Sequence, residues 1–281
     1  MARSMSLHVG LNSVDPAHYD GWDGQLTACE FDANDMRAIA EALGYDESTT
    51  LLTADGTADA IIGEIERAAG SLGAGDLFFV SYSGHGGQVQ DRDNEGETDR
   101  SDETWVAYDR QIVDDELYVL WGKFAEGVRV VVLSDSCHSG TVLRDLGQQV
   151  PNPVADRETA AAQSPRYRAM PWDVVVSTYR AHKDLYDGIQ EATPDSPQDD
   201  VSARVLLISG CQDEQLSSDG MSNGLFTENL LDVWDKGGWD RGGYQEFAEA
   251  IRSQMPAEQQ PNYYAVGARD PEFEARKPFT P

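Results

Sequence analysis

Two stretches of the chain, DLFFVSYS (76–83) and VRVVVLSDS (128–136), are apolar at nearly every position. A strand with one solvated face alternates apolar and polar residues, whereas a strand covered on both faces is apolar throughout. ARVLLISG (203–210) repeats the pattern, and SLHVGLN (6–12) and PNYYAVG (261–267) have the composition of further strands. These runs predict a central sheet that is buried on both faces.

Segments with helical periodicity lie between the predicted strands. Residues 29–45 carry apolar residues on one face and have Gly44 near their end, and residues 57–72 repeat this with Thr57 as candidate N-cap. Further helices are predicted over 224–234 and 244–255, with a shorter one over 114–124. Helices that alternate with buried strands indicate an α/β fold, with a mainly parallel β-sheet flanked by helices on both faces.

The 281 residues are predicted to form one domain, 1–281. Residues from about 144 to 200 are rich in proline and polar residues, which predicts surface loops. No apolar run reaches the roughly 18 residues of a membrane span, and the first residues do not resemble a secretory signal. We therefore expect a cytoplasmic protein without a membrane partner.

The formal net charge of −29 argues against binding to nucleic acid, because phosphates would be repelled. Basic substrates or cations fit this charge, although solubility or a salty habitat is the more common reason for such acidity. The three cysteines, Cys29, Cys137 and Cys211, are too few and too scattered for a disulfide framework or a zinc site. Each cysteine therefore has to be considered separately.

Two predicted strands end in small and polar residues, YSGHGG (82–87) and SDSCHSG (134–140). Ligands of open α/β sheets gather at the carboxyl ends of the strands. His85 and Cys137 are therefore expected at one edge of the sheet, with the glycines letting the backbone approach a substrate. His138 is the rival base, but its side chain should diverge from that of Cys137. Cys211, at another strand end, is expected to be a small buried residue.

A cysteine paired with a histidine is a nucleophile with its base. The thiolate attacks, and the histidine accepts the thiol proton and returns it to the leaving amine. The backbone N–H groups of Gly86 and Cys137 are candidate donors to the oxyanion of the tetrahedral intermediate. Either residue alone is more often structural, and only the pair points to catalysis.

The sequence resembles the metacaspases, the caspase-like cysteine peptidases of bacteria, plants, fungi and protists. Asp135 and Ser136 precede Cys137, as in metacaspases, where caspases carry glutamine and alanine. The resemblance implies the caspase-like fold, divided into a large-subunit-like part (about 1–145), a loop region (146–200) and a small-subunit-like part (201–281). It is carried by LHVGLN (7–12), GQLTACEFDANDM (24–36), DLFFVSYSGHGG (76–87), IVDDEL (112–117), VVLSDSCHSGTVL (131–143), LLISGCQDEQLSSDG (206–220) and NGLFTENLL (223–231).

The resemblance implies that His85 is the base, that Cys137 is the nucleophile, and that peptide bonds are cut after arginine or lysine. The pocket for that basic side chain, the S1 pocket, would be lined by Cys29, Asp32, Ser83 and Asp135. Physical chemistry agrees, because two carboxylates at the base of a pocket would pair with a guanidinium or ammonium group. Asp32 alone could be only a first-turn helix acid, whereas an aspartate on a strand of valine and leucine needs a partner.

Many metacaspases are activated by calcium, and the matching acidic positions are Asp102, Asp114 and Asp115. A fourth acid of the family falls where this chain has Arg144 followed by Asp145, which weakens the site unless Asp145 takes that place. Oxygen ligands of this kind suit Ca²⁺. The chemistry itself requires no cofactor, and calcium is expected, if anywhere, as an activator.

The resemblance also implies self-cleavage after arginine or lysine, and candidate sites are Arg166, Arg168, Arg180 and Lys183. These residues could equally be solvated surface charges. The expected partners are protein or peptide substrates with a basic residue before the cut bond, and the expected assembly is a monomer. The alternative from another class is a non-catalytic caspase-like signalling module that binds basic peptides without cutting them.

Overall fold

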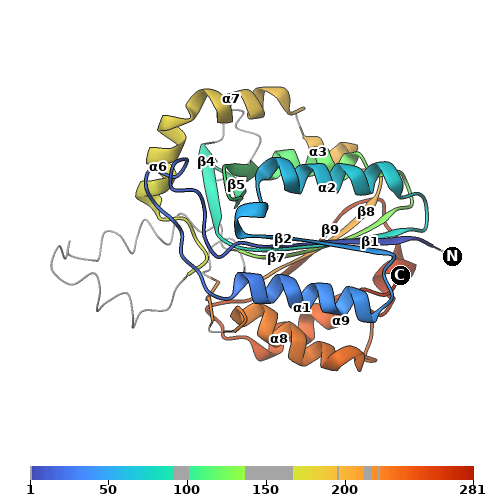
Figure 1. Ribbon diagram of the computed structural model, residues 1–281. Coiled ribbons are helices and arrows are strands. Elements are labelled where there is room, and N and C mark those ends of the chain that lie inside the picture. The colour runs from blue at the N-terminus through green and yellow to red at the C-terminus, as the bar shows by residue number, and fades with distance from the viewer. Residues whose placement is uncertain (1, 91–100, 137–166, 195, 212–216, 221) are drawn as a thin grey trace.

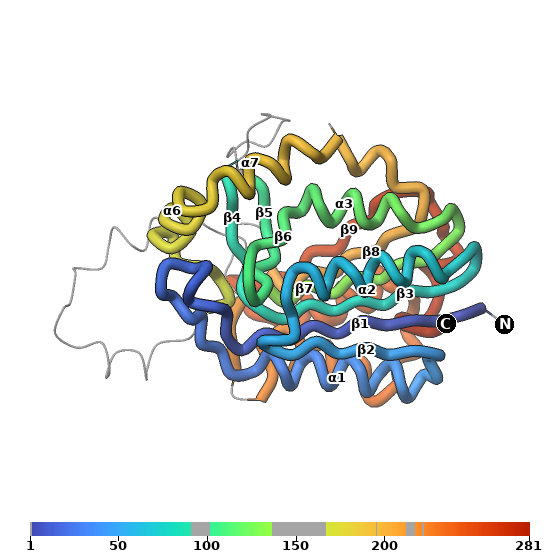
Figure 2. The backbone as a smooth tube through the Cα atoms, turned by 45° about the horizontal axis from the view of Figure 1, so that its top comes forward, coloured from blue at the N-terminus to red at the C-terminus, as the bar shows by residue number. Residues whose placement is uncertain are grey.

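The computed structural model describes residues 2–90, 101–136, 167–194, 196–211, 217–220 and 222–281. A six-stranded sheet forms the centre, with the strand order β2-β1-β3-β7-β8-β9 (Figures 1 and 2). All neighbouring strands are parallel except β9, which pairs antiparallel with β8. The strands are β1 (Ser4–Gly10), β2 (Glu47–Leu52), β3 (Leu77–Ser83), β7 (Arg129–Asp135), β8 (Arg204–Ser209) and β9 (Asn262–Gly267).

Helices cover both faces of this sheet, as predicted. In Figure 1, α2 and α3 lie above it and α1, α8 and α9 below it. The bounds are α1 (Cys29–Ala42), α2 (Ala58–Ser71), α3 (Asp114–Gly122), α8 (Leu225–Trp234) and α9 (Tyr244–Gln254), with the short α10 (Pro271–Glu274) near the C-terminus. Short 3-10 turns η1 (Thr53–Asp55), η2 (Pro197–Asp200) and η3 (Asp235–Gly237) lie in the connections. The mainly parallel α/β prediction is therefore confirmed.

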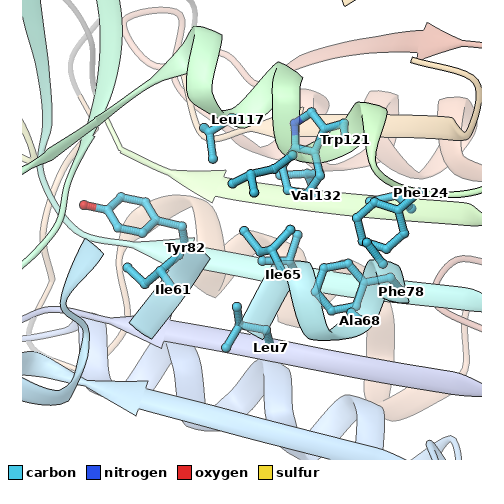
Figure 3. Packing of buried hydrophobic residues seen from close by; sticks show 14 of the residues in the cluster. Leu7, Ile61, Ile65, Ala68, Phe78, Tyr82, Leu117, Trp121, Phe124 and Val132 are labelled. Carbon is cyan, nitrogen blue, oxygen red and sulfur yellow. The ribbon is translucent and has the colours of Figure 1, made fainter. Parts of the chain in front are cut away.

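Strand β3 shows why the apolar runs have no polar alternation. Phe78, Val80 and Tyr82 pack under α2 and α3, while Leu77 and Phe79 pack against α1, α8 and α9. Figure 3 shows the first of these two cores, in which Leu7, Ile61, Ile65, Ala68, Phe78, Tyr82, Leu117, Trp121, Phe124 and Val132 interdigitate. Both layers bury apolar side chains, which is the main stabilising contribution to such a fold.

A local signal in the sequence places the start of α2 correctly. The Thr57 hydroxyl accepts a hydrogen bond from the Ala60 N–H at 3.2 Å, so the predicted N-cap of α2 is confirmed. None of the helices in the described part of the chain is both long and apolar enough to cross a membrane.

A small antiparallel sheet stands beyond the central one. It consists of β4 (Gly86–Gln90), β5 (Ser101–Val106) and β6 (Gln111–Val113), in that order. Helices α6 (Trp172–Ala181) and α7 (Lys183–Ala192) lie beside it (Figure 1). The prediction of loops from 144 to 200 is therefore wrong for 172–192, because Tyr186 packs on Val89 and Val113 and fixes α7 there. Residues 137–166 lie outside the described part.

Candidate active site

The site lies where β3 and β7 end, at the left of the sheet in Figure 1. The two strands are parallel neighbours, and their register pairs Ser83 with Asp135. His85 follows Ser83 by two positions, and Cys137 follows Asp135 by two. Cys137 and His138 lie outside the described residues, so the geometry of the site is built from the residues around them.

The ring of His85 is buried, with 5% of the residue exposed, and is oriented by its neighbours. Its Nε2 lies 3.0 Å from the carbonyl oxygen of Gly24, and the Trp22 ring packs against it with centroids 4.7 Å apart. A carbonyl oxygen only accepts hydrogen bonds, so Nε2 carries the proton. Nδ1 is then the basic nitrogen, and it has no hydrogen-bond partner among the described residues.

Burial also sets the charge of this histidine. Loss of water around the ring lowers the pKa of His85 from 6.5 to about 4, against the opposing effect of the Gly24 carbonyl. The imidazole is therefore neutral at pH 7. A neutral ring with an unprotonated Nδ1 is the state that a general base requires.

The backbone N–H of Gly86, a candidate oxyanion donor, makes a hydrogen bond of 2.9 Å to the carbonyl oxygen of Arg168. Gly86 begins β4, directly after His85. The donor therefore points at a backbone carbonyl group, the kind of group that a peptidase attacks.

A buried acidic pocket lies beside the histidine and holds the guanidinium group of Arg168. Nη1 of Arg168 lies 2.7 Å from Asp135 Oδ2, and Nη2 lies 2.7 Å from Asp32 Oδ2 and 3.2 Å from Asp219 Oδ1. Nη1 also donates to the Ser83 hydroxyl at 2.8 Å. Arg168 has no exposed surface. A forked cation thus meets three carboxylates out of contact with water, the arrangement in which arginine pairs strongly.

Hydroxyl and amide groups hold the carboxylates in place. Asp135 accepts hydrogen bonds from the hydroxyls of Ser217 (2.6 Å) and Thr227 (3.1 Å). Asp32 accepts from the Asn223 side chain (3.0 Å) and from the Gly224 N–H (3.1 Å). These contacts fix the orientation of both carboxylates around the guanidinium.

Asp32 gains a proton more readily than an ordinary aspartate, chiefly because it is buried. Burial raises the pKa of Asp32 from 3.8 to about 6, and the charge of Asp135 raises it further, although Arg168 opposes both. Asp32 stands in the first turn of α1, so the helix-acid interpretation is also correct. Its burial at 1% exposure shows that it does more than complement the helix dipole.

Cys29 completes the set of four predicted pocket residues. It is fully buried, and burial raises the pKa of its thiol to about 12, so it stays a neutral thiol. Arg168, Asp32 and Ser83 are among the groups that act on that thiol. The structure therefore brings Cys29, Asp32, Ser83 and Asp135 together around a single cation.

Sequence reasoning missed three participants. Asp219, the third acid, comes from the segment after β8, and Gly24 orients His85 through a backbone carbonyl that no side-chain pattern reveals. Gly224 leaves room for the guanidinium, because a Cβ there would lie 2.5 Å from Nη2 of Arg168. The only available signal was the small polar run SSDG (217–220) after a buried strand.

The predicted calcium ligands are placed only in part. Asp102 is on β5, where its carboxylate accepts a hydrogen bond of 2.6 Å from Gln190 on α7. Asp114 and Asp115 begin α3. The described residues include no group of three or more His, Cys, Asp or Glu that could hold a metal ion. Arg144 and Asp145 lie outside them, so calcium binding stays a prediction.

Cys211 is buried, as expected for a structural residue, and its thiol donates to the Ser136 carbonyl at 3.2 Å.

Comparison with solved structures identifies the architecture. Protein GSU0716 of Geobacter sulfurreducens is 50% identical, with a TM-score of 0.87 over 99% of this chain and 98% of that one. Caspase-1 of Spodoptera frugiperda is 12% identical, with a TM-score of 0.54 over 95% of this chain and 86% of that one, which shows a shared fold.

Curated relatives are metacaspases. Metacaspase-1 of Mycosarcoma maydis is 28% identical over 88% of this chain and 66% of its own length, and metacaspase-1A of Neurospora crassa is 31% identical over 77% and 52%. The chain thus spans about half to two thirds of these relatives. The family model described as the caspase domain matches residues 14–273. The chain therefore belongs to the caspase-domain family, and within that family it is of the metacaspase type.

Proposed function

We propose that this chain is a cysteine endopeptidase that cleaves peptide bonds after arginine or lysine, with Cys137 as nucleophile and His85 as base. The observation that carries the proposal is the guanidinium of Arg168 enclosed by Asp32, Asp135 and Asp219. A pocket built from three carboxylates binds a basic side chain and repels an aspartate.

His85 is suited to activate a thiol at the end of β7. Parallel neighbours lie about 4.8 Å apart, and His85 and Cys137 follow the paired residues Ser83 and Asp135 by the same two positions. Nδ1 would take the thiol proton, and the thiolate would attack the carbonyl carbon of the substrate. The N–H groups of Gly86 and Cys137 would receive the oxyanion, and His85 would return the proton to the leaving amine.

The pocket favours arginine over lysine. Nη1 of the bound guanidinium contacts Asp135 while Nη2 contacts Asp32 and Asp219, so the two nitrogens contact different carboxylates. A lysine ammonium is a single point charge and cannot reach both sides in the same way. We therefore expect cleavage after both residues, with arginine preferred.

Calcium activation through Asp102, Asp114, Asp115 and Asp145 remains part of the proposal, as do a monomeric state and a cytoplasmic location. The alternative is a non-catalytic module that binds basic peptides. The same pocket supports it, since holding a guanidinium does not require cutting. Turnover of a basic peptide distinguishes the peptidase from the non-catalytic module.

The test uses fluorogenic peptides that differ only in arginine, lysine or aspartate before the reporter, with calcium or with chelator. Cys137→Ala removes the nucleophile, and Cys211→Ala is the matched control because it removes another cysteine at a strand end. Turnover of the arginine and lysine peptides that survives Cys211→Ala and disappears in Cys137→Ala supports the peptidase. Binding of the arginine peptide without turnover under either condition would favour the module instead.

A further inference from the structure

A cavity of about 100 Å³ lies on the α3 side of the central sheet, between that helix and strands β7, β8 and β9. Most of its wall is apolar or aromatic, and the wall includes Trp105, Leu117, Tyr118, Trp121, Val205 and Leu207 (Figure 3 labels Leu117 and Trp121). The cavity reaches the surface at Tyr264, which is 40% exposed. An enclosed apolar cavity of about 150 Å³ binds benzene, so a cavity of 100 Å³ that also opens to solvent has room for one aromatic ring.

The charged residues that line this cavity are acidic. Glu103 and Asp114 contribute to the wall and are partly exposed, and none of the described residues in the wall is basic. Their charge is felt at the open end, because burial raises the pKa of Tyr264, and the neighbouring Tyr118 and the two carboxylates raise it further. The carboxylates therefore favour a cation at this end of the cavity, and the faces of the aromatic rings favour it as well.

One side of the cavity leads to the residue that precedes the candidate nucleophile. Trp105 and Ser134 both line the cavity, and the indole N–H of Trp105 donates to the Ser134 hydroxyl at 3.0 Å. That hydroxyl lies 3.0 Å from the hydroxyl of Ser136, which comes directly before Cys137. A ligand that contacts Trp105 is therefore two hydrogen bonds away from Ser136.

This cavity is separate from the pocket that holds Arg168. Successive side chains of a strand point to opposite faces of the sheet. On β7, Asp135 pairs with Arg168, whereas Ser134 lines the cavity. The sheet therefore lies between the two sites, and substitutions can test each of them alone.

We infer that the cavity between α3 and β7–β9 is a binding site for a small organic cation that carries an aromatic ring, and that this ligand changes the rate at which Cys137 reacts. The ring fills the apolar part of the cavity, and the cationic group lies by the carboxylates of Glu103 and Asp114. Binding does not depend on the proposed peptidase function, whereas the effect on rate rests on it.

The expected effect on rate is an increase. A ring beside Trp105 restricts the motion of that side chain and of Ser134, to which it is hydrogen-bonded. A rigid support favours the productive position of a catalytic group. We therefore expect the ligand to raise kcat for an arginine peptide and to leave KM unchanged, because the pocket for the basic side chain lies on the other face of the sheet.

Three probes of similar size test the binding, with chelator present so that calcium cannot compete. Phenethylamine, phenethyl alcohol and hydrocinnamate are cationic, neutral and anionic at pH 7. NMR titration follows the indole N–H signals of the protein, and Trp105→Phe and Trp121→Phe assign the two signals that should shift. We expect the affinity to fall in the order amine, alcohol, carboxylate. Equal affinity for the three probes, or shifts confined to the other tryptophans, would overturn the inference.

Substitutions locate the bound amine. Glu103→Gln should weaken phenethylamine binding roughly fivefold, whereas Glu258→Gln removes an exposed carboxylate elsewhere and should not weaken it. Val266→Phe places a ring in the cavity and should abolish binding, and Ala265→Phe, which points to the other face of β9, should not. Asp135→Asn should leave binding intact. If Val266→Phe does not fold, the comparison of Glu103→Gln with Glu258→Gln still decides.

Hydrolysis of an arginine peptide tests the effect on rate, in calcium or chelator, whichever supports turnover. Phenethylamine should raise kcat by about twofold or more, and phenethyl alcohol at the same concentration should raise it less. A rise in KM alone would place the amine in the pocket of Arg168, and an unchanged kcat at saturating amine would equally contradict the inference. If no peptide is cut with or without the amine while the NMR signals shift, the proposed function fails and the binding site stands.

Discussion

Arg168 Nη1 and Asp135 Oδ2 lie 2.7 Å apart, at a place where neither side chain is more than 3% exposed. A lone buried carboxylate costs several kcal/mol, so the pair explains how an aspartate can end a strand of valine and leucine. We expect Asp135→Asn to remove about 2 kcal/mol or more of binding to a basic side chain, which lowers kcat/KM for an arginine peptide roughly 30-fold. Steady-state kinetics checks this.

Asp35→Asn is the control for that loss of charge. Asp35 lies one turn from Asp32 on α1 and accepts a hydrogen bond from Asn223 at 2.8 Å, but it makes no ion pair with Arg168. Its substitution should change kcat/KM only slightly. Equal losses in both variants would mean that general negative charge, and not contact with the guanidinium, sets the specificity.

Binding of basic substrates should weaken in acid before catalysis does. The pKa of Asp32 is raised to about 6, so this carboxyl gains a proton and loses its charge as the pH falls from 7 to 5. His85, with its pKa lowered to about 4, stays neutral in that range. KM for an arginine peptide should therefore rise while kcat stays level, as measured by kinetics at each pH.

Removal of the Asp32 carboxylate offers a second check on this pH dependence. Asp32→Asn should bind the arginine peptide more weakly at pH 7, and its KM should change less with pH. A falling kcat with a constant KM would assign the titration to His85 instead.

Most of the central fold was predictable because burial on both faces is visible in single segments such as 76–83. Helices α6 and α7 were not, since their buried faces are small and partly polar, with Thr178 and Gln190 among the covered residues. The small antiparallel sheet was missed for a related reason. Its shortest strand, β6, has three residues, too few to display a period.

The candidate site, too, was predictable only in part. His85 and the aspartates at positions 32 and 135 stand in segments whose local pattern is informative. Asp219 reaches the pocket only because the chain returns there after β8. Arg168 reaches the pocket from a part of the chain that is distant in sequence from Asp32 and Asp135. No spacing of residues in the sequence predicts such a contact.

Gly224→Ala should weaken the binding of an arginine side chain more than that of a lysine side chain. Gly224 has an ordinary φ of −63°, so alanine fits its backbone, but the added Cβ would lie 2.5 Å from Nη2 of the guanidinium. Overpacking costs about 1–3 kcal/mol, and KM for an arginine peptide should rise roughly tenfold. KM for the lysine peptide should rise less, because an ammonium group is narrower than a guanidinium. The ratio of kcat/KM for the arginine peptide to that for the lysine peptide should therefore fall.

Gly63→Ala provides the comparison, because Gly63 is an exposed residue of α2 whose Cβ would meet nothing within 4 Å. This change should leave both peptides unaffected and stabilise the helix by about 0.5–1 kcal/mol. An unaltered arginine-to-lysine ratio in Gly224→Ala would mean that substrate arginine does not enter the pocket as Arg168 does.

Gly24→Ala should slow the chemical step without weakening binding, because Gly24 positions His85. Its φ is +55°, and a Cβ there would lie 3.1 Å from Cδ2 of the imidazole. Gly21→Ala carries the same kind of backbone strain, with a φ of +84° and nothing within 4 Å. Both variants should lose about 1–2 kcal/mol of stability in thermal unfolding. Only Gly24→Ala should lower kcat, by roughly tenfold out of the 10²–10⁴-fold that general-base catalysis supplies. KM for the arginine peptide should not change. An equal fall of kcat in Gly21→Ala would mean that backbone strain, and not the position of the imidazole, causes the loss.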